Sequence, residues 1–234
     1  MKSGVDISDL LGTRGPTIER IVPGCVPSDC EREHLARYQW AARELQGASV
    51  HRVLDSASGV GYGSAVLSKA GYDVVSIDCF REAVAFGSSR RWISKPLVGD
   101  VLELPFKSNS FDAVVSLETI EHLRRPGGFV KEVARVLKTG GLFLLSTPNA
   151  ELSEQKNPYH HREFNLEELV AILVNAGFSI GGVLGQRLTL RGRFWERVRG
   201  LRRISWEIRR FSRVTRFYSP FAKPLVWCVR ATQA

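Results

Sequence analysis

The chain has 234 residues, which is enough for one sizeable domain whose core needs no disulfide or metal for its stability. Hydrophobic residues make up 44 % of the chain and charged residues 24 %, so the composition excludes a disordered or a fibrous protein. The four cysteines form no C-x-x-C pair, and we expect them to be reduced thiols without a structural metal.

The net charge of +9 is concentrated in one segment of the chain. Eleven lysines and arginines lie between Arg191 and Lys223, against only Glu196 and Glu207. The rest of the chain holds 22 basic and 22 acidic residues and is therefore neutral. An anionic partner would accordingly be drawn to this segment.

The amino-terminal sequence resembles neither a secretory signal nor a membrane anchor. The first twenty residues include Asp6, Asp9 and Glu19 and lack a sufficient apolar run. No window approaches the roughly 18 uncharged apolar residues of a membrane-spanning helix. We expect a cytoplasmic protein, and contact with the inner membrane surface stays open.

Residues 1–50 differ in character from the rest of the chain. Gly, Pro and Asp come early, and the stretch "CEREHLARYQWAARELQG" then places apolar residues at helical spacing. We predict that residues 1–50 form a helical cap on the fold, within a single domain that covers residues 1–234.

From Val53 onward, strand-like runs alternate with helical patterns. The predicted strands are "RVLD", "DVVSID", "KPLVGD", "FDAVVSLE" and "GLFLLST", with "FSIGGVLGQR" and "PLVWCVRATQ" as two further candidates. Between them, helical patterns include "SAVLSKAG", "REAVAFGSSR" and "NLEELVAILVNAGF", the last with Asn165 as a plausible N-cap. This alternation predicts an α/β fold with a parallel sheet and helices on both faces.

A basic insertion, residues 190–223, precedes the last predicted strand. Its apolar residues from Trp195 to Val214 recur three or four apart, which predicts an amphipathic helix with an arginine-rich face over residues 191–221. The apolar stripe could pack on the sheet or on a second subunit, as in a homodimer. Alternatively, the segment could lie on an anionic membrane, or bind nucleic acid or a phosphorylated substrate.

The stretch "VLDSASGVGYGS" ends a strand in a glycine-rich turn. Asp55 closes the strand, and the glycines at positions 59, 61 and 63 let the main chain approach a ligand. Asp78 ends the second strand 23 residues later, where an acid can accept hydrogen bonds from a ribose diol. Asp100 ends the third strand and could accept from an adenine amine. The three acids predict an adenosyl site.

Five motifs in this order resemble the class I S-adenosylmethionine-dependent methyltransferases. The family pattern has an aspartate followed by alternating glycines, an acid at the second strand and "GD" at the third. It continues with "FDxVxSxxxxEH" at the fourth strand and "LKxGGxxxxSTPN" at the fifth. The match runs from about Arg20 to Gly185 and resumes near Pro224. The resemblance implies a Rossmann-like, seven-stranded, mostly parallel sheet with helices on both faces.

The same resemblance implies S-adenosylmethionine as the cofactor. A nicotinamide-binding domain is disfavoured, because its fingerprint is G-x-G-x-x-G rather than glycines at alternate positions. One departure is that Ala57 and Ser58 stand where the family usually has glycine and often cysteine, and alanine cannot adopt positive φ cheaply. The implied cofactor-binding residues are Asp55, Ser56, Ala57, Ser58, Gly59, Gly61, Asp78, Cys79, Asp100, Val101 and Glu118.

The stretch "NPYHHREF", residues 157–164, follows the fifth strand and matches the "NPxHxxEF" pattern of similar sugar and natural-product methyltransferases. We predict His160 or His161 as the catalytic base, because imidazole titrates near neutral pH. The alternative is that these histidines only hold the loop. Predicted substrate-binding residues are Tyr38, Tyr159 and His160.

The segment "LETIEHL" contains Glu118, Glu121 and His122. It resembles the segment that ubiquinone-biosynthesis O-methyltransferases use to hold a divalent cation, although metal-free relatives share the "EH". We therefore expect no metal, a structural role for His122 and a place for Glu118 in the cofactor wall.

The opening "ERIVPGCVPSDCEREHLARYQWA" is similar to that of bacterial methyltransferases found with glycan-assembly enzymes. This similarity suggests that Arg20, His34 and Tyr38 face the site, unless they only cap the helix. It favours O-methylation of a saccharide or another small or lipid-linked acceptor. An RNA methyltransferase that uses the basic insertion, and a non-catalytic cofactor-binding module, are the alternatives.

Overall fold

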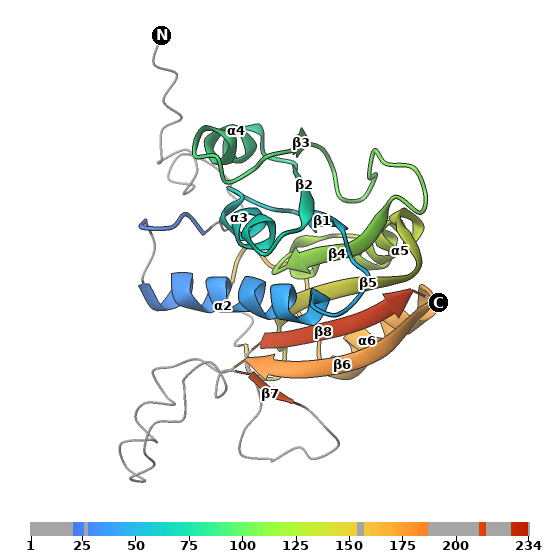
Figure 1. Ribbon diagram of the computed structural model, residues 1–234. Coiled ribbons are helices and arrows are strands. Elements are labelled where there is room, and N and C mark those ends of the chain that lie inside the picture. The colour runs from blue at the N-terminus through green and yellow to red at the C-terminus, as the bar shows by residue number, and fades with distance from the viewer. Residues whose placement is uncertain (1–20, 26–27, 154–156, 187–210, 214–225, 234) are drawn as a thin grey trace.

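A computed structural model describes residues 21–25, 28–153, 157–186, 211–213 and 226–233 of the chain (Figure 1). The first twenty residues of the predicted cap, and residues 190–210 and 214–223 of the basic insertion, lie outside this described part.

Helices and strands alternate along most of the chain. The helices are α2 (Ser28–Leu45), α3 (Tyr62–Lys69), α4 (Arg81–Ser89), the short 3-10 helix η1 (Ile120–His122), α5 (Pro126–Val136) and α6 (Leu166–Asn175). The strands are β1 (Arg52–Ser56), β2 (Asp73–Asp78), β3 (Pro96–Val98), β4 (Phe111–Leu117), β5 (Leu137–Pro148), β6 (Phe178–Gln186), β7 (Phe211–Arg213) and β8 (Val226–Gln233). None of the described helices combines the length and the apolar character that crossing a bilayer requires.

The strands form one sheet in the order β3-β2-β1-β4-β5-β8-β6-β7. The five strands from β3 to β5 pair in parallel, and β8 runs antiparallel between β5 and β6. This topology confirms the predicted fold, with β1 to β6 and β8 as the seven expected strands. The short β7 adds an eighth strand beside β6.

The strand β7 corrects part of the predicted basic helix. Phe211–Arg213 pairs antiparallel with Leu184–Gln186 of β6, although the apolar spacing had placed Phe211 on an amphipathic helix. An edge strand offers a row of main-chain donors and acceptors, and pairing with them can override a helical pattern.

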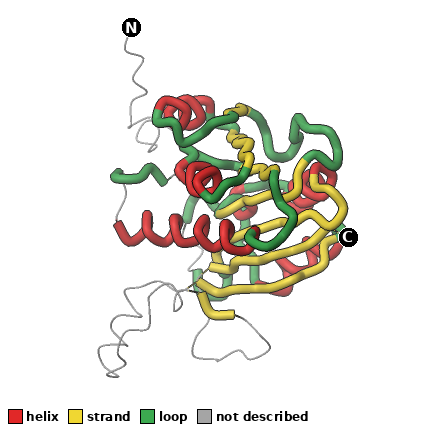
Figure 2. Tube along the Cα trace, viewed as in Figure 1, coloured by secondary structure: helices red, strands yellow, loops and turns green. Residues whose placement is uncertain are grey.

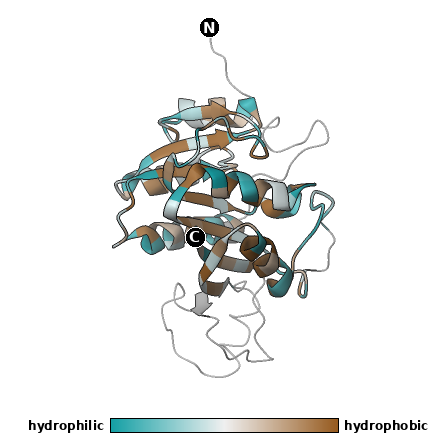
Figure 3. Ribbon diagram, turned by 90° about the vertical axis from the view of Figure 1, so that its right-hand side faces the viewer, coloured by the Kyte–Doolittle hydropathy of each residue, from teal (hydrophilic) through white to brown (hydrophobic). Residues whose placement is uncertain are grey.

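Helices cover both faces of the sheet (Figures 1 and 2). Successive residues of a strand point to opposite faces, so Val53 and Ala113 join a core with α2 and α3. Leu54, Val114 and Phe143 join a second core with α5 and α6. The strands are mostly brown in Figure 3, as expected for strands buried on both faces.

Helix α6 begins at a complete capping box. The side chain of Asn165 accepts a hydrogen bond from the main-chain N–H of Glu168, and the carboxylate of Glu168 accepts one from the N–H of Asn165. The cap confirms the predicted start of this helix and fixes the end of the preceding loop, residues 157–164.

Replacing the cap should destabilise the protein. We expect Asn165→Ala to lower the free energy of unfolding by about 1 kcal/mol, measured by urea denaturation, because an orphan helix donor loses its acceptor. Asn175→Ala, at the exposed last residue of the same helix, is the control and should change it by less than about 0.5 kcal/mol. Equal effects of the two substitutions would contradict the capping role.

Candidate functional site

The candidate site lies where β1 and β4 pair side by side. The chain continues from β1 to β2 and β3 on one side, and β4 returns to the other side, so the order of the strands reverses here. In open parallel sheets such a point forms a crevice beyond the carboxyl ends of the strands. Ala57 and Glu118, which directly follow β1 and β4, have left-handed φ values of 61° and 54°. Strain of this kind in residues other than glycine is often found at functional sites.

The surroundings of the three glycines in the turn after β1 differ, and so does the reason why each position suits glycine. A Cβ on Gly61 would lie 2.1 Å from the side chain of Ile93, and a Cβ on Gly63 would lie 2.0 Å from the ring of Tyr38. A Cβ on Gly59 would meet nothing within 4 Å. Packing therefore requires Gly61 and Gly63, and only Gly59 borders open space that a ligand could enter.

The serines beside Ala57 carry buried hydroxyls. Ser56 and Ser58 are 0 % and 3 % exposed, and in the described part of the chain neither Oγ has a hydrogen-bond partner. The main-chain N–H of Ser58 donates to the carbonyl of Ile77, which ties the turn to β2. Buried hydroxyls without partners are costly, so this turn has unused capacity for hydrogen bonds.

Asp55 is buried at the end of β1 and is held by protein donors. Tyr38 Oη donates to its Oδ1 at 3.1 Å, and Ser64 Oγ donates to its Oδ2 at 2.5 Å. Burial raises the pKa of Asp55 to about 7, and the nearby Asp78 adds to the rise, although the two hydrogen bonds oppose it. Asp55 therefore shapes the turn from inside, and any contact with the predicted cofactor would be indirect.

Asp78 links the end of β2 to the turn after β1. Its Oδ2 accepts from the N–H of Gly59 at 2.8 Å, and its Oδ1 accepts from the N–H of Phe80 at 2.9 Å. Each carboxylate oxygen has a second lone pair, so a ribose diol could still be bound. Asp78 thus remains well placed for its predicted role.

The remaining predicted residues of the adenosyl site follow β2 and β3. Cys79 is exposed, and Val101 is buried. Asp100 is exposed, and its Oδ1 accepts from the N–H of Leu102 at 2.8 Å. Together with the open space at Gly59 and the acidic charge of Asp78, these residues fit a positively charged adenosyl ligand.

Glu118 is fixed by neighbours from three elements. Its Oε1 accepts from Ser146 Oγ at 2.7 Å, and its main-chain N–H donates to the carbonyl of Ser146. Its Oε2 lies 3.4 Å from Nη1 of the buried Arg37, whose Nε donates to Gln186 Oε1. The predicted wall residue is therefore anchored to α2, β5 and β6 together.

The structure corrects the predicted role of Tyr38 as a substrate-binding residue. Tyr38 is only 5 % exposed, its ring packs against Gly63, and its hydroxyl is committed to Asp55. It is part of the core between α2 and the sheet. The side chain of Tyr159 remains accessible, because the residue is 42 % exposed. Its main-chain carbonyl lies 3.0 Å from His122 Nδ1.

His160 and His161 differ in their surroundings. His160 Nδ1 lies 2.5 Å from Glu163 Oε1, and His160 Nε2 lies 3.0 Å from Asn157 Nδ2. Because a carboxylate accepts and an amide nitrogen donates, the proton is on Nδ1 and the lone pair is on Nε2. The side chain of His161 is exposed, while its N–H donates to the carbonyl of Glu121. His160 is therefore the better oriented of the two predicted bases.

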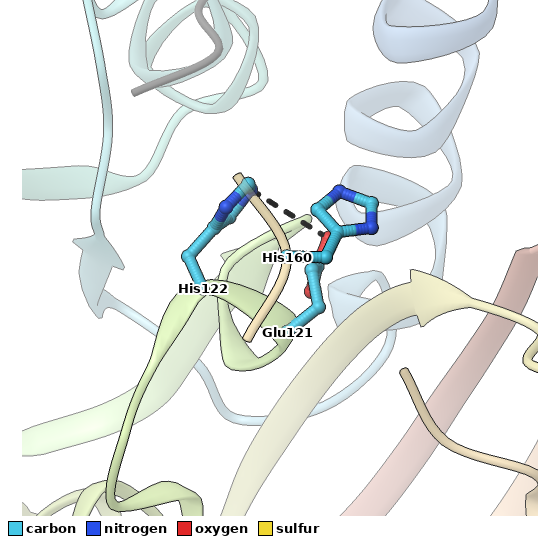
Figure 4. A group of neighbouring side chains, drawn as sticks. All are labelled: Glu121, His122 and His160. Atoms are coloured by element: carbon cyan, nitrogen blue, oxygen red, sulfur yellow. Dashed lines mark ion pairs between the residues drawn. The ribbon is translucent and has the colours of Figure 1, made fainter. Parts of the chain in front are cut away.

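Glu121 is a buried acid beside these histidines. Its side chain is 1 % exposed, and Oε2 accepts from Thr147 Oγ1 at 2.9 Å. Burial, with a further contribution from the Glu118 carboxylate, holds the pKa of Glu121 well above its usual range. His122 packs edge-on against His160, with 4.9 Å between ring centroids. Figure 4 shows the side chains of Glu121, His122 and His160 converging.

The structure brings together three side chains whose ligand atoms could hold a metal ion. Ligand atoms of Glu121, His122 and His160 lie within 4.8 Å of one another. Glu118, which we expected in the cofactor wall, is held by Ser146 and Arg37 and is not in this group.

An open cavity of about 500 Å3 lies against the loop that carries His160. Its lining consists of Ala150, Glu151, His160, His161, Arg162, Glu163, Asn165 and Glu168, of which all but Ala150 carry polar side chains. A cavity with this many donors and acceptors suits a hydroxyl-rich molecule.

Several supporting residues were not predicted. Glu163 could have been found, because it stands three residues after His160 in the "NPxHxxEF" pattern. Ser146 likewise stands in the "LKxGGxxxxSTPN" pattern, whereas Arg37 and Ser64 gave no comparable signal, since their partners lie 81 and 9 residues away.

Comparisons with known sequences agree with this geometry. The family described as "Methyltransferase domain" matches residues 54–145. A protein of Mycolicibacterium smegmatis named "Probable S-adenosylmethionine-dependent methyltransferase" is 35 % identical over 175 residues, which cover 72 % of this chain and 67 % of that protein. A similarly named protein of Mycobacterium tuberculosis H37Rv is 36 % identical over 168 residues, and the alignment spans 69 % of this chain and 60 % of that protein's length.

More distant relatives share parts of the sequence or the fold alone. A demethylmenaquinone methyltransferase of Renibacterium salmoninarum is 37 % identical over 95 residues, 41 % of this chain and 40 % of that protein. The crystal structure of an Aquifex aeolicus SAM-dependent methyltransferase has a TM-score of 0.62 at 18 % identity and covers 98 % of this chain and 99 % of that one.

The strain at Ala57 leads to a prediction about stability. Ala57→Gly should raise the free energy of unfolding by about 1 kcal/mol in urea denaturation, because glycine adopts left-handed φ without steric cost. Ala65→Gly within α3 is the control and should lower it by about 1 kcal/mol. A loss of stability in Ala57→Gly would show that the alanine is not strained.

Asp55 leads to a prediction about pH. Its carboxyl binds a proton more tightly in the folded state, with a pKa near 7 against 3.8, so stability falls as pH rises from about 4 to 7. Asp55→Asn should remove this loss, which is at most about 4 kcal/mol, when unfolding is followed by urea titration at several pH values. Asp100→Asn, at an exposed acid, should keep the wild-type profile. The same slope in Asp55→Asn and wild type would contradict the assignment.

Proposed function

The chain belongs to the S-adenosylmethionine-dependent methyltransferases, and from this premise we propose that it methylates a hydroxyl oxygen of a saccharide or another small or lipid-linked acceptor. Family membership identifies S-adenosylmethionine as the cofactor and methyl transfer as the class of reaction. The acceptor is the proposed part, and the observation that carries it is His160, oriented by Glu163 beside a polar cavity.

The cofactor end of the proposed site uses the residues of the crevice. When bound, S-adenosylmethionine supplies an electrophilic methyl group on its sulfonium. Gly59 gives access to the main chain, Asp78 would accept from the ribose, and Asp100 with Val101 would border the adenine. Glu118, anchored by Ser146, would form the wall next to the methionine end.

The acceptor end of the proposed site uses the loop of residues 157–163. A hydroxyl that replaced the Asn157 amide at His160 Nε2 would meet a nitrogen lone pair, because the other ring nitrogen donates to Glu163. Methyl transfer to a hydroxyl requires both alignment and loss of its proton. We therefore propose that removal of this proton depends on His160.

A saccharide fits the cavity better than an apolar acceptor does. Its lining includes three glutamates, an arginine, an asparagine and two histidines, which can all hydrogen bond to hydroxyl groups. The contacts of the basic insertion with a membrane, a second subunit or nucleic acid remain predictions about residues that are largely outside the described part of the chain.

Substitution of His160 tests the proposed acceptor end. His160→Ala should reduce the rate of methyl transfer at least about 100-fold, as expected when a group that handles the proton is lost. His51→Ala, at an exposed histidine that does not line the cavity, is the control and should stay within a few-fold of wild type. Normal turnover by His160→Ala would remove His160 from the mechanism.

The acceptor class is tested with labelled S-adenosylmethionine and cell extract separated into lipid, nucleic-acid and water-soluble pools. Label on a saccharide or lipid-linked saccharide is the expected result. Label on a quinone in the lipid pool, or in the nucleic-acid pool, would replace the proposed acceptor. Cofactor binding without transfer to any pool would indicate a non-catalytic module.

A further inference from the structure

The cavity beside His160 has a charge opposite to that of the whole chain. Its described lining includes three carboxylates and one guanidinium, those of Glu151, Glu163, Glu168 and Arg162. With both lining histidines neutral, as a base at His160 requires, the formal charge of this lining is −2, whereas the whole chain carries +9. The neighbouring residues 154–156, outside the described part, are Glu, Gln and Lys and have no net charge. The excess of acid is therefore specific to the acceptor end.

The positive charge of Arg162 is already matched within the loop. Arg162 Nη2 donates to Glu168 Oε1 at 2.7 Å, and the guanidinium lies over the ring of Phe164, 5.3 Å from its centroid. The hydrogen bond from the main-chain N–H of Asn165, followed by that from Arg162, holds the pKa of Glu168 below its usual range, so this carboxylate is charged at neutral pH. An anionic acceptor would therefore have to compete with Glu168 for the guanidinium.

The lining carboxylates need a ligand that donates hydrogen bonds. Glu163 Oε1 accepts from His160 Nδ1, and Oε2 of the same side chain, which is 2 % exposed, has no hydrogen-bond partner in the described part of the chain. A carboxylate only accepts, whereas the hydroxyl groups of a neutral sugar can donate. The ionised carboxylate or phosphate of an acidic sugar also only accepts, and it adds negative charge. The lining therefore matches a neutral sugar and repels an anionic one.

From this charge pattern we propose that the cavity admits a sugar unit only if that unit carries no negative charge, and that Glu151 determines this specificity. Glu163 supports His160, and Glu168 supports the cap of α6, whereas Glu151 is the exposed carboxylate of the three. A like charge placed against a wrong partner is an effective means of excluding it. The restriction rests on the proposed function, since it names the kind of saccharide that the same site takes.

The restriction applies to the unit inside the cavity and not to the whole acceptor. A phosphate elsewhere on a lipid-linked saccharide would have to lie beyond the acidic lining. The basic insertion, residues 190–223, is the predicted partner of such an anionic group. The cavity and the insertion would then select different parts of one acceptor.

The charge of the methylated unit is tested with full-length protein, methyl-labelled S-adenosylmethionine and a cell extract that contains neutral and acidic saccharides. Labelled saccharides are hydrolysed to their units, which are separated by anion exchange. We expect at least about tenfold more label in uncharged units than in retained uronates and sugar phosphates. Label mainly in retained units would overturn the proposed restriction and leave the proposed function intact. Label on no saccharide would remove the proposed function, and the restriction with it.

Glu151→Gln tests whether this carboxylate causes the rejection. The share of label in retained, anionic units should rise at least about threefold above wild type, because one of the repelling charges is removed. Glu167→Gln, at an exposed acid of α6 that does not line the cavity, is the matched control and should keep the wild-type share. The share is a ratio within one reaction, so a loss of folded protein does not change it. An unchanged share in Glu151→Gln would overturn its role.

Salt dependence separates repulsion from steric exclusion. Raising the salt concentration from about 0.1 M to about 1 M shortens the screening length from about 10 Å to about 3 Å. The wild-type share of anionic units should then rise toward that of Glu151→Gln. A wild-type share that does not change with salt would show that shape excludes the anionic units, which would overturn the proposed selection by charge.

Discussion

The parallel pairing of β1 with β4 is the constraint on which the rest of the site depends. Val53, Leu54 and Asp55 lie opposite Ala113, Val114 and Val115, and these residues are all fully buried. A slip of one residue would send each side chain to the opposite face of the sheet, so the two hydrophobic cores fix the register. The register in turn fixes where the turn after β1 and the turn after β4 leave the sheet. Gly59 and Glu118 both lie beyond the carboxyl ends of these paired strands for this reason.

Helix α2 ties both of these turns to the body of the protein. Tyr38 donates to Asp55 at the end of β1, and Arg37, the preceding residue, faces Glu118 after β4. Both contacts join polar groups that would be costly to bury alone, so each partner depends on the other. Helix α2 thus holds both turns as well as covering the sheet. It also explains why left-handed φ values at Ala57 and Glu118 can persist, since the surrounding contacts hold both turns in place.

The acceptor end depends on a different kind of contact. The loop with His160 has no regular structure, yet hydrogen bonds to η1, Glu163 and Asn157 hold it. The capping box at Asn165 stops this loop and starts α6 in a defined direction. Such a loop can differ between related proteins without disturbing the sheet. For this reason the cofactor is inferred from the fold, and the acceptor is inferred from the residues of the loop.

Much of this protein could be predicted from the amino-acid sequence by itself. Apolar runs of strand length, alternating with helical spacing, determined the α/β class, and Asp55, Asp78 and Asp100 marked the ends of three strands, because these patterns are local. Tertiary structure alone decided that Tyr38 packs against Gly63, that Phe211 joins a strand, and that His160 rather than Glu118 meets Glu121 and His122. Contacts between residues tens of positions apart depend on how helices and loops pack on the sheet, and spacing along the chain carries no record of that packing.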